Sequence, residues 1–128
     1  MPNGIQLFGD RMYVTNSDAG TLLRFDVDER GALRDPSVVL TGVPADDFAF
    51  APDGTLYLTT HIFDTVVRVD PDGRRSVIAA AAEHVTGATD CALVPGTGGG
   101  TVLYVVTDGG ALVSGDPSAA GALVALSV

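Results

Sequence analysis

The sequence predicts an all-β fold built from about three four-stranded antiparallel sheets. Apolar and β-branched residues occur in short runs, turn-forming residues separate these runs, and the pattern of runs repeats along the chain. The 128 residues include 16 glycines and seven prolines, and 46% of the residues are hydrophobic. This composition is typical of many strands that are joined by tight turns around a buried core.

The internal repeat is clearest in the second and third strands of each copy. Tyr13 is followed 44 residues later by Tyr57, and Asp26 is followed by Asp70 at the same interval. A weaker third copy places Tyr104 in the equivalent strand. Repeats of roughly 40–50 residues that each hold several short strands are typical of the blades of a β-propeller.

Turn residues divide each copy into strands. The first copy predicts strands at 5–8, 11–15, 21–27 and 37–40, with Gly-Asp and Asn-Ser-Asp turns between them. The second copy predicts strands at 48–51, 55–60, 65–70 and 76–80, with two Pro-Asp-Gly turns. The third copy predicts strands at 91–94, 101–107 and 122–127 and lacks a fourth. We therefore expect blades over residues 2–42, 45–80 and 87–128, the third of them incomplete.

The alanine-rich stretch 78–84 is the one segment with helical character, and it is too short to hold as an isolated helix. We expect it to continue the fourth strand of the second repeat into a loop.

Three blades do not close a ring, because propellers have about four to eight blades and each blade buries its faces against its neighbours. Two arrangements stay open at this point. The chain is the C-terminal half of a longer protein, or a second copy of the chain completes the ring. The expected partners are therefore the missing upstream blades or a second copy.

The charge of the chain argues against several classes of partner. The net charge is −9, with 16 acidic and seven basic residues, so binding to a nucleic-acid backbone is not expected. No apolar run approaches the roughly 18 residues that a membrane span needs, and no signal peptide is visible. We expect a soluble domain, cytoplasmic or secreted if an upstream half carries a signal. The single cysteine, Cys91, excludes an internal disulfide and a cysteine-based zinc site.

Polar residues gather where each repeat begins its first strand. In an antiparallel meander this point lies at the same face as the loop between strands two and three, so both positions should ring the channel mouth. The first set is Asn3, Asp46 and Thr89, followed by Gly4, Asp47 and Asp90. The loops add Asn16, Ser17, Asp18, His61, Asp64 and Asp108.

This face is rich in oxygen donors and contains no lysine or arginine, a setting that hard divalent cations prefer. A structural role stays open for the same residues, because Asn and Asp also bond to backbone groups in turns. The turn interpretation is favoured for Asp18, Asp64 and Asp108.

Three segments of the sequence resemble one known family. They are Pro2-Asn3-Gly4-Ile5, Asp46-Asp47-Phe48 with Leu56-Tyr57-Leu58, and Thr89-Asp90-Cys91. Together they resemble the senescence-marker protein (regucalcin), gluconolactonase and luciferin-regenerating-enzyme family. The resemblance covers essentially the whole chain but only the C-terminal half of the family's length. It implies a six-bladed propeller that binds one divalent metal in its channel, and many members hydrolyse lactones.

The resemblance also implies which residues bind the metal. Asn3 matches an asparagine ligand in a Pro-Asn-Gly motif, and Asp46 matches the aspartate of a later Pro-Asp-Gly motif. Ala45 and Asp47 replace the proline and glycine of that second motif, so either Asp46 or Asp47 faces the metal. The family's glutamate ligand and a second channel asparagine lie upstream and have no counterpart here.

The activity implied by the resemblance is metal-assisted hydrolysis of a carboxylic ester bond in a small lactone or sugar-acid substrate. Asp46 would serve as a ligand and as the catalytic base. His61, Asp47, Thr89 and Asp18 would contact the substrate at the rim. Calcium is the expected metal, with zinc, magnesium or manganese as alternatives. Because half of the ligands are missing, we expect the isolated chain to be inactive; a non-catalytic binding module is the alternative function.

Overall fold

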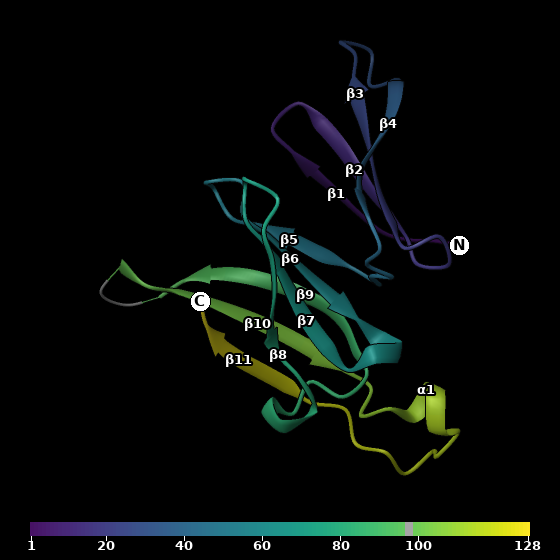
Figure 1. The fold of residues 1–128 in the computed structure, drawn as a ribbon, viewed down its shortest axis with the longest axis vertical. Helices are drawn as coiled ribbons and strands as arrows, with labels where there is room; N and C mark the ends of the chain where they lie inside the picture. The colour runs from purple at the N-terminus through teal and green to yellow at the C-terminus, as the bar shows by residue number, and fades with distance from the viewer. Residues whose placement is uncertain (97–98) are drawn as a thin grey trace.

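The strands form three antiparallel sheets that follow one another along the chain in the computed structural model, which describes residues 1–96 and 99–128 (Figure 1). Blade 1 consists of β1 (Pro2–Phe8), β2 (Arg11–Asn16), β3 (Thr21–Val27) and β4 (Leu33–Thr41). Blade 2 consists of β5 (Phe48–Phe50), β6 (Leu56–Thr60), β7 (Thr65–Val69) and β8 (Arg75–Ala79). Blade 3 consists of β9 (Ala88–Pro95), β10 (Thr101–Thr107) and β11 (Leu123–Ser127).

The predicted all-β class is confirmed. Only three short helical turns occur in the described residues: η1 (His61–Phe63), η2 (Ala81–Glu83) and α1 (Ala111–Ser114). The stretch 78–84 continues β8 as far as Ala79, as predicted, and then forms a 3₁₀ turn, at which the Glu83 carboxylate accepts the backbone N–H of Ala80 at 2.9 Å. None of the described helices has the length and hydrophobicity that a bilayer crossing requires.

The start of β1 differs from the prediction. We expected the strand to begin at residue 5, with Asn3 just before it, yet β1 begins at Pro2 and Asn3 lies inside it. The Pro-Asn-Gly sequence favours a turn locally, but pairing with β2 extends to Pro2↔Asn16 across a register shift between Pro2 and Ile5. Tertiary pairing therefore overrides the local turn preference at this position.

Blade 2 packs between blades 1 and 3, and it buries side chains on both of its faces. Towards blade 1 its buried residues include Phe48, Leu56 and Leu58, packed with Leu22 and Leu40. Towards blade 3 its buried residues include Tyr57 and Val66, packed with Cys91, Leu103 and Val105. The cysteine is thus a buried thiol in the core, and burial raises its pKa.

Two threonines at equivalent positions of the repeat tie neighbouring blades together. Thr15 Oγ1 on blade 1 donates to the carbonyl of Asp46 at 2.8 Å. Thr59, 44 residues later, has its Oγ1 atom 3.1 Å from the carbonyl of Thr89 at the start of blade 3. Both bonds lie where one strand two ends and the next blade begins, so they fix the spacing of the blades at this end.

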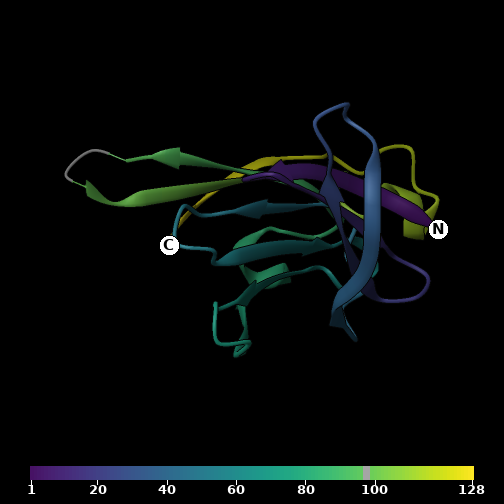
Figure 2. The same cartoon turned by 90° about the horizontal axis from the view of Figure 1, so that it is seen from above.

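Figures 1 and 2 show the resulting arrangement. The N-terminus, the turn after β6 and α1 all lie towards the same side of the molecule in Figure 1. Figure 2 again shows the N-terminus and α1 at the same end, and blade 1 crosses at an angle to blades 2 and 3. One end of the sheets therefore collects the segments that the repeat assigned to the channel face.

Candidate functional site at the channel face

Backbone hydrogen bonds at this face join blade 1 to blade 2 and connect distant segments within blades 2 and 3. The Gly4 N–H of β1 donates to the Asp46 carbonyl at 2.8 Å, and the Asp46 N–H donates to the Thr59 carbonyl at the end of β6, also at 2.8 Å. The Asp108 N–H, after β10, donates to the Gly87 carbonyl at 3.0 Å. These bonds bring segments that are distant in sequence into one cluster.

Gly4 is required by this close approach. A Cβ atom at this position would lie 2.5 Å from Asp47 Oδ1 and 2.7 Å from the Asp46 carbonyl oxygen. Both distances are shorter than van der Waals contact, and one of the two neighbours is backbone. The glycine of the Pro-Asn-Gly segment therefore has a packing role, which is to let blade 1 approach the loop that carries Asp46 and Asp47.

Asp46 lies half-buried in this cluster without a basic partner. Among the described residues, no hydrogen bond or ion pair reaches its carboxylate, and the chain contains no lysine. Burial raises the pKa of Asp46; the field of His61 opposes this shift and the negative charge of Asp108 adds to it. A nearby cation would stabilise the charged form of this carboxylate and so offset both its burial and the repulsion from Asp108.

Asp47 has a different set of neighbours. Its Oδ1 accepts the backbone N–H of Phe48 at 2.8 Å and lies against Gly4. Burial raises the pKa of Asp47, the hydrogen bond from Phe48 lowers it, and the charge of Asp90 raises it further. Asp46 is therefore coupled to His61 and Asp108, whereas Asp47 is coupled to the backbone and to Asp90.

His61 and Asp108 form the best-defined side-chain pair at this face. His61 is only 3% exposed, and its Nε2 lies 2.9 Å from Asp108 Oδ2. Asp108 also accepts the N–H groups of Gly110 at 2.6 Å and Leu112 at 2.9 Å. The hydrogen bond from His61, followed by that from Leu112, lowers the pKa of Asp108 to about 2.

This pairing fixes the proton on the imidazole. Asp108 is ionised at neutral pH, so Nε2 carries the hydrogen and donates it to the carboxylate. In the neutral ring Nδ1 is then an acceptor, and no hydrogen bond to Nδ1 occurs among the described residues. The pair joins η1 of blade 2 to the loop after β10 of blade 3.

The sequence placed Asp108 among the loop residues of this face and favoured a turn role for it. It does accept the N–H groups that begin α1, but it also orients His61. Its place directly after the second strand of the third repeat was a signal for this role, because His61 follows the second strand of the second repeat in the same way. Gly87 makes room for the carboxylate, since a Cβ atom there would overlap Asp108 Oδ1.

The remaining predicted site residues lie around this cluster. Asn3 is exposed, and its Nδ2 donates to Ser17 Oγ at 3.3 Å, which leaves its amide oxygen without a hydrogen bond among the described residues. Thr89 uses its hydroxyl within blade 3, donating to the Val106 carbonyl at 3.2 Å. Asp18 pairs with the ammonium group of Met1 at 2.7 Å and is strongly exposed. The structure thus places Asp18 at the outer edge of the face.

The side chains at this face include the type of ligand that a hard divalent cation prefers, but too few of them to complete a coordination sphere. The Asp46 carboxylate and the Asn3 amide oxygen are suitable ligands without a competing cation. However, no group of three or more His, Cys, Asp or Glu side chains in the described part of the chain is arranged to hold a metal. Asn3 and Asp46 are therefore at most part of a coordination sphere.

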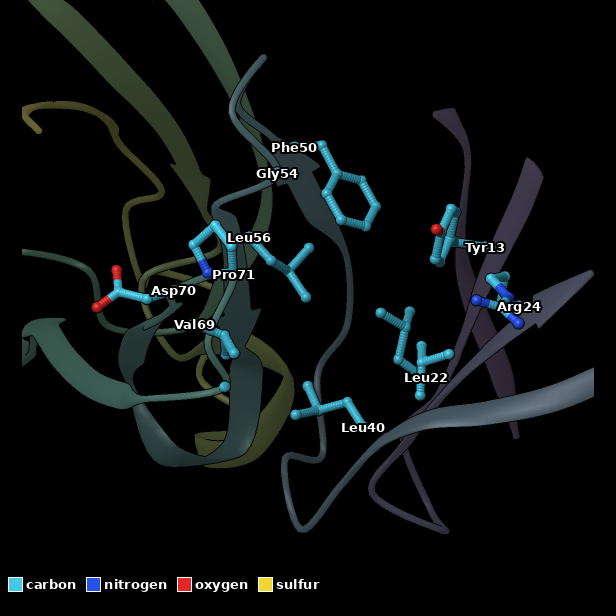
Figure 3. Close-up of a pocket in the computed structure, with 12 residues that line it drawn as sticks. Tyr13, Leu22, Arg24, Leu40, Phe50, Gly54, Leu56, Val69, Asp70 and Pro71 are labelled. Atoms are coloured by element: carbon cyan, nitrogen blue, oxygen red, sulfur yellow. The ribbon is translucent and has the colours of Figure 1, made fainter. Parts of the chain in front are cut away.

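A cavity of about 290 Å³ lies elsewhere, between the outer parts of blades 1 and 2. Figure 3 shows Tyr13, Leu22 and Arg24 of blade 1 across this gap from Phe50, Leu56 and Val69 of blade 2. None of Asn3, Asp46 and His61 lines it. We therefore treat this cavity as a packing feature and not as part of the candidate site.

Solved structures with the same architecture decide the fold. A luciferin-regenerating enzyme superposes with a TM-score of 0.70 at 15% sequence identity, over 98% of this chain and 44% of that chain. The virginiamycin B lyase from Staphylococcus aureus gives 0.54 at 14% identity, over 84% of this chain and 38% of that chain. A streptogramin B lyase gives 0.53 at 13% identity, over 95% of this chain and 39% of that chain.

The chain has the fold of β-propeller blades. The luciferin-regenerating enzyme is one of the proteins after which the family suggested by the motifs is named, so the expected resemblance is confirmed at the level of the fold. This propeller chain spans 38–44% of the length of these three structures. No family model and no curated protein sequence matches it.

Proposed function

We propose that this chain carries half of a divalent-metal site in a lactone hydrolase, with Asn3 and Asp46 as metal ligands. The observation that carries the proposal is the Asp46 carboxylate, which is half-buried, has a raised pKa and has no basic partner among the described residues. A bound cation would compensate this buried charge. The fold shared with luciferin-regenerating enzyme and the Pro-Asn-Gly segment support the same assignment.

Asp46 is a better candidate ligand than Asp47 in this proposal. One oxygen of Asp47 already accepts the Phe48 N–H, and the carboxylate lies against Gly4. The Asp46 carboxylate has no such hydrogen bond among the described residues. Asn3 adds a neutral oxygen, which coordinates without increasing the negative charge that already surrounds Asp46 and Asp108.

The residues of the chain would then divide the chemistry. A bound divalent cation supplies Lewis-acid polarisation of the ester carbonyl and lowers the pKa of water. Asp46 would accept a proton from the attacking water and return it to the ring oxygen, which leaves as an alcohol when the ester C–O bond breaks. His61, held by Asp108, offers Nδ1 as an acceptor for a hydroxyl group of a small lactone or sugar-acid substrate. Calcium is the proposed metal, and the remaining ligands would come from blades beyond these three.

The proposal is tested by calorimetric titration of the 128-residue chain with calcium chloride. We expect Asp46→Asn to weaken calcium binding by about tenfold or more because it removes the charge of a ligand, and we expect Asn3→Ala to do the same because it removes a ligand oxygen. Asp53→Asn is the matched control: it removes the same charge from an exposed turn, where the carboxylate caps the Thr55 N–H at 2.9 Å. Asp47→Asn should bind calcium as the wild type does.

Equal calcium affinity of the wild type, Asp46→Asn and Asn3→Ala would contradict the metal site. It would favour the non-catalytic binding module, since a propeller face can bind ligands without catalysis. In an assay of lactone hydrolysis, a monomer of this chain should show no turnover. Turnover by the monomer would refute the half-site assignment.

A further inference from the structure

The two outer blades each present one apolar face that nothing covers in the described structure. Blade 1 has blade 2 on one side only: Phe8 stacks on Phe50 with ring centroids 4.5 Å apart, and Tyr13 packs on the same ring at 4.7 Å. Because side chains alternate along a strand, the neighbours of Phe8 and Tyr13 point to the opposite face. That face is the one that a preceding blade would cover.

The free face of blade 1 is apolar over its central part, with Asn16 and Thr21 at one end. Strand pairing places its residues in two rows, Ile5–Val14–Leu23–Val38 and Leu7–Met12–Phe25. Ile5 is 60% exposed and Leu7 is 61% exposed. A contiguous apolar surface of this kind marks an interaction site in a soluble protein.

The repeat shows what such a face contacts. Met12, Val14 and Phe25 precede Leu56, Leu58 and Val69 by 44 residues each. These three residues of blade 2 are buried against blade 1. The free face of blade 1 therefore corresponds to the face of blade 2 that packs against the blade before it.

Blade 3 presents the complementary face. Leu103 and Val105 of β10 are buried against blade 2, so Val102, Tyr104 and Val106 point away from it. Pairing adds Val94, Ala92, Leu123 and Ala125 to this free face, with Asp90 and Ser127 as polar residues at its two ends.

A comparison of Tyr57 with Tyr104 shows how the covered face of blade 2 differs from the free face of blade 3. Both follow a leucine in the second strand of their repeats, but Tyr57 is 5% exposed and Tyr104 is 37% exposed. Blade 3 covers Tyr57, whereas no described residue does the same for Tyr104. A hollow of about 110 Å³ beside Tyr104, bordered by Ala92, Val106 and Leu123 with Asp90 and Cys91 at its edge, is large enough to take an aliphatic side chain. The free face of blade 3 therefore corresponds to the face that packs against a following blade.

We propose that a second copy of this chain covers both free faces, with blade 3 of each copy packed against blade 1 of the other. The two contacts are identical and related by a twofold axis, so the assembly closes. Each chain spans 44% of a luciferin-regenerating enzyme, so two copies hold about as much propeller as that enzyme. The closed ring would bring two sets of Asn3 and Asp46 to one channel. The contact itself depends on apolar packing and not on the proposed metal site.

The test is the mass of the 128-residue chain by light scattering after size exclusion, in calcium and in EDTA. We expect twice the 13.1 kDa of one chain in both buffers, because apolar burial and not metal drives the contact. Leu7→Glu on blade 1 and Leu123→Glu on blade 3 should each give the mass of one chain. Leu112→Glu is the matched control, since Leu112 is 79% exposed on α1 and belongs to neither face.

Leu7 and Leu123 are both mostly exposed, so circular dichroism should show an unchanged fold in the two face variants. If one variant unfolds, the mass of the other variant and that of the wild type still show whether the pair forms through these faces. A wild-type monomer in EDTA, or a series of masses that grows with concentration, would overturn the closed pair. A doubled mass without calcium binding would contradict the proposed metal site but not the closed pair.

Discussion

The joint between blades 2 and 3 and the joint between blades 1 and 2 use the same repeat but pack differently. Between blades 2 and 3, Val66, Leu103 and Val105 are fully buried in one continuous cluster. Between blades 1 and 2, Leu22 and Leu58 are buried, but the cavity of about 290 Å³ remains towards the outer strands. This cavity is lined by the buried residues Leu22, Leu40 and Leu56. The joint between blades 2 and 3 also has hollows at its outer end, of about 340 and 330 Å³ beside Tyr57 and Arg68, but Val66, Leu103 and Val105 line neither of them.

The channel ends of the two joints are nevertheless alike. Thr15 and Thr59 make corresponding hydrogen bonds to the start of the next blade. The outer ends differ because equivalent residues find different partners. Arg68 donates to Asp70 at 2.8 Å, whereas the Nε of Arg24, its counterpart beside the cavity, is buried without a partner among the described residues. The repeat thus sets the spacing at the channel, and individual side chains decide how well the outer ends fill.

The largest difference is expected from core truncation. Leu103→Ala should lower the free energy of unfolding by about 3–5 kcal/mol, because Leu103 is fully buried and borders neither hollow of its joint, so its truncation opens a new cavity. Leu22→Ala should cost about 2–3 kcal/mol, since Leu22 already borders the existing cavity and loses fewer contacts. Urea unfolding at one fixed protein concentration measures both. An equal or larger loss for Leu22→Ala would mean that the joints are packed alike.

A smaller effect is expected from the bond between His61 and Asp108, which ties blade 2 to blade 3. Asp108→Ala should lower the free energy of unfolding by about 1–3 kcal/mol at pH 7, because it removes a hydrogen bond to a charged group. The pKa of Asp108 in the folded chain is about 2, below its ordinary value of 3.8. A lowered folded pKa stabilises the fold above about pH 4, and this contribution is lost as the pH falls towards 2.

The deficit of Asp108→Ala should therefore be full at neutral pH and should shrink between pH 4 and 2. Asp108→Asn is the matched variant: it keeps a hydrogen-bond acceptor without the charge, so its loss should be smaller and should carry less pH dependence. Thermal unfolding of the three proteins across this range provides the measurement. A constant deficit of Asp108→Ala at every pH would show that the charge of Asp108 contributes nothing.

The smallest effect is expected at Arg24 and Arg68, which occupy equivalent positions of the repeat. Its sign should differ between the two positions. Arg24→Met should raise the free energy of unfolding by up to about 1 kcal/mol, because it removes a buried unpaired Nε and keeps an apolar chain beside the cavity. Arg68→Met should lower it by about 0.2–1 kcal/mol, since it removes the partly exposed ion pair with Asp70. Urea unfolding of both variants compares the two joints at equivalent positions. Destabilisation by both substitutions would show that Arg24 contributes to stability as Arg68 does.

Local sequence signals predicted most of the strands. The bounds of β3 and β10 agree with the prediction, and the other strands differ at their ends or, for β4, by a longer N-terminal extension. This agreement arises because Asp, Gly and Pro end strands through their own backbone preferences. The shared location of Asn3, Asp46 and His61 at one end of the sheets was also predicted, since strand order alone brings their segments together.

The sequence by itself thus determined the number of blades and the residues at the channel face, because the repeat and its turns are local properties. Only the tertiary structure decided which of these residues meet. His61 and Asp108 are 47 residues apart in the chain, and Gly4 is needed only because Asp47 lies against it. The cavity beside Arg24 likewise depends on how two sheets pack. Such contacts follow from side-chain volume and long-range geometry, which a repeat pattern does not encode.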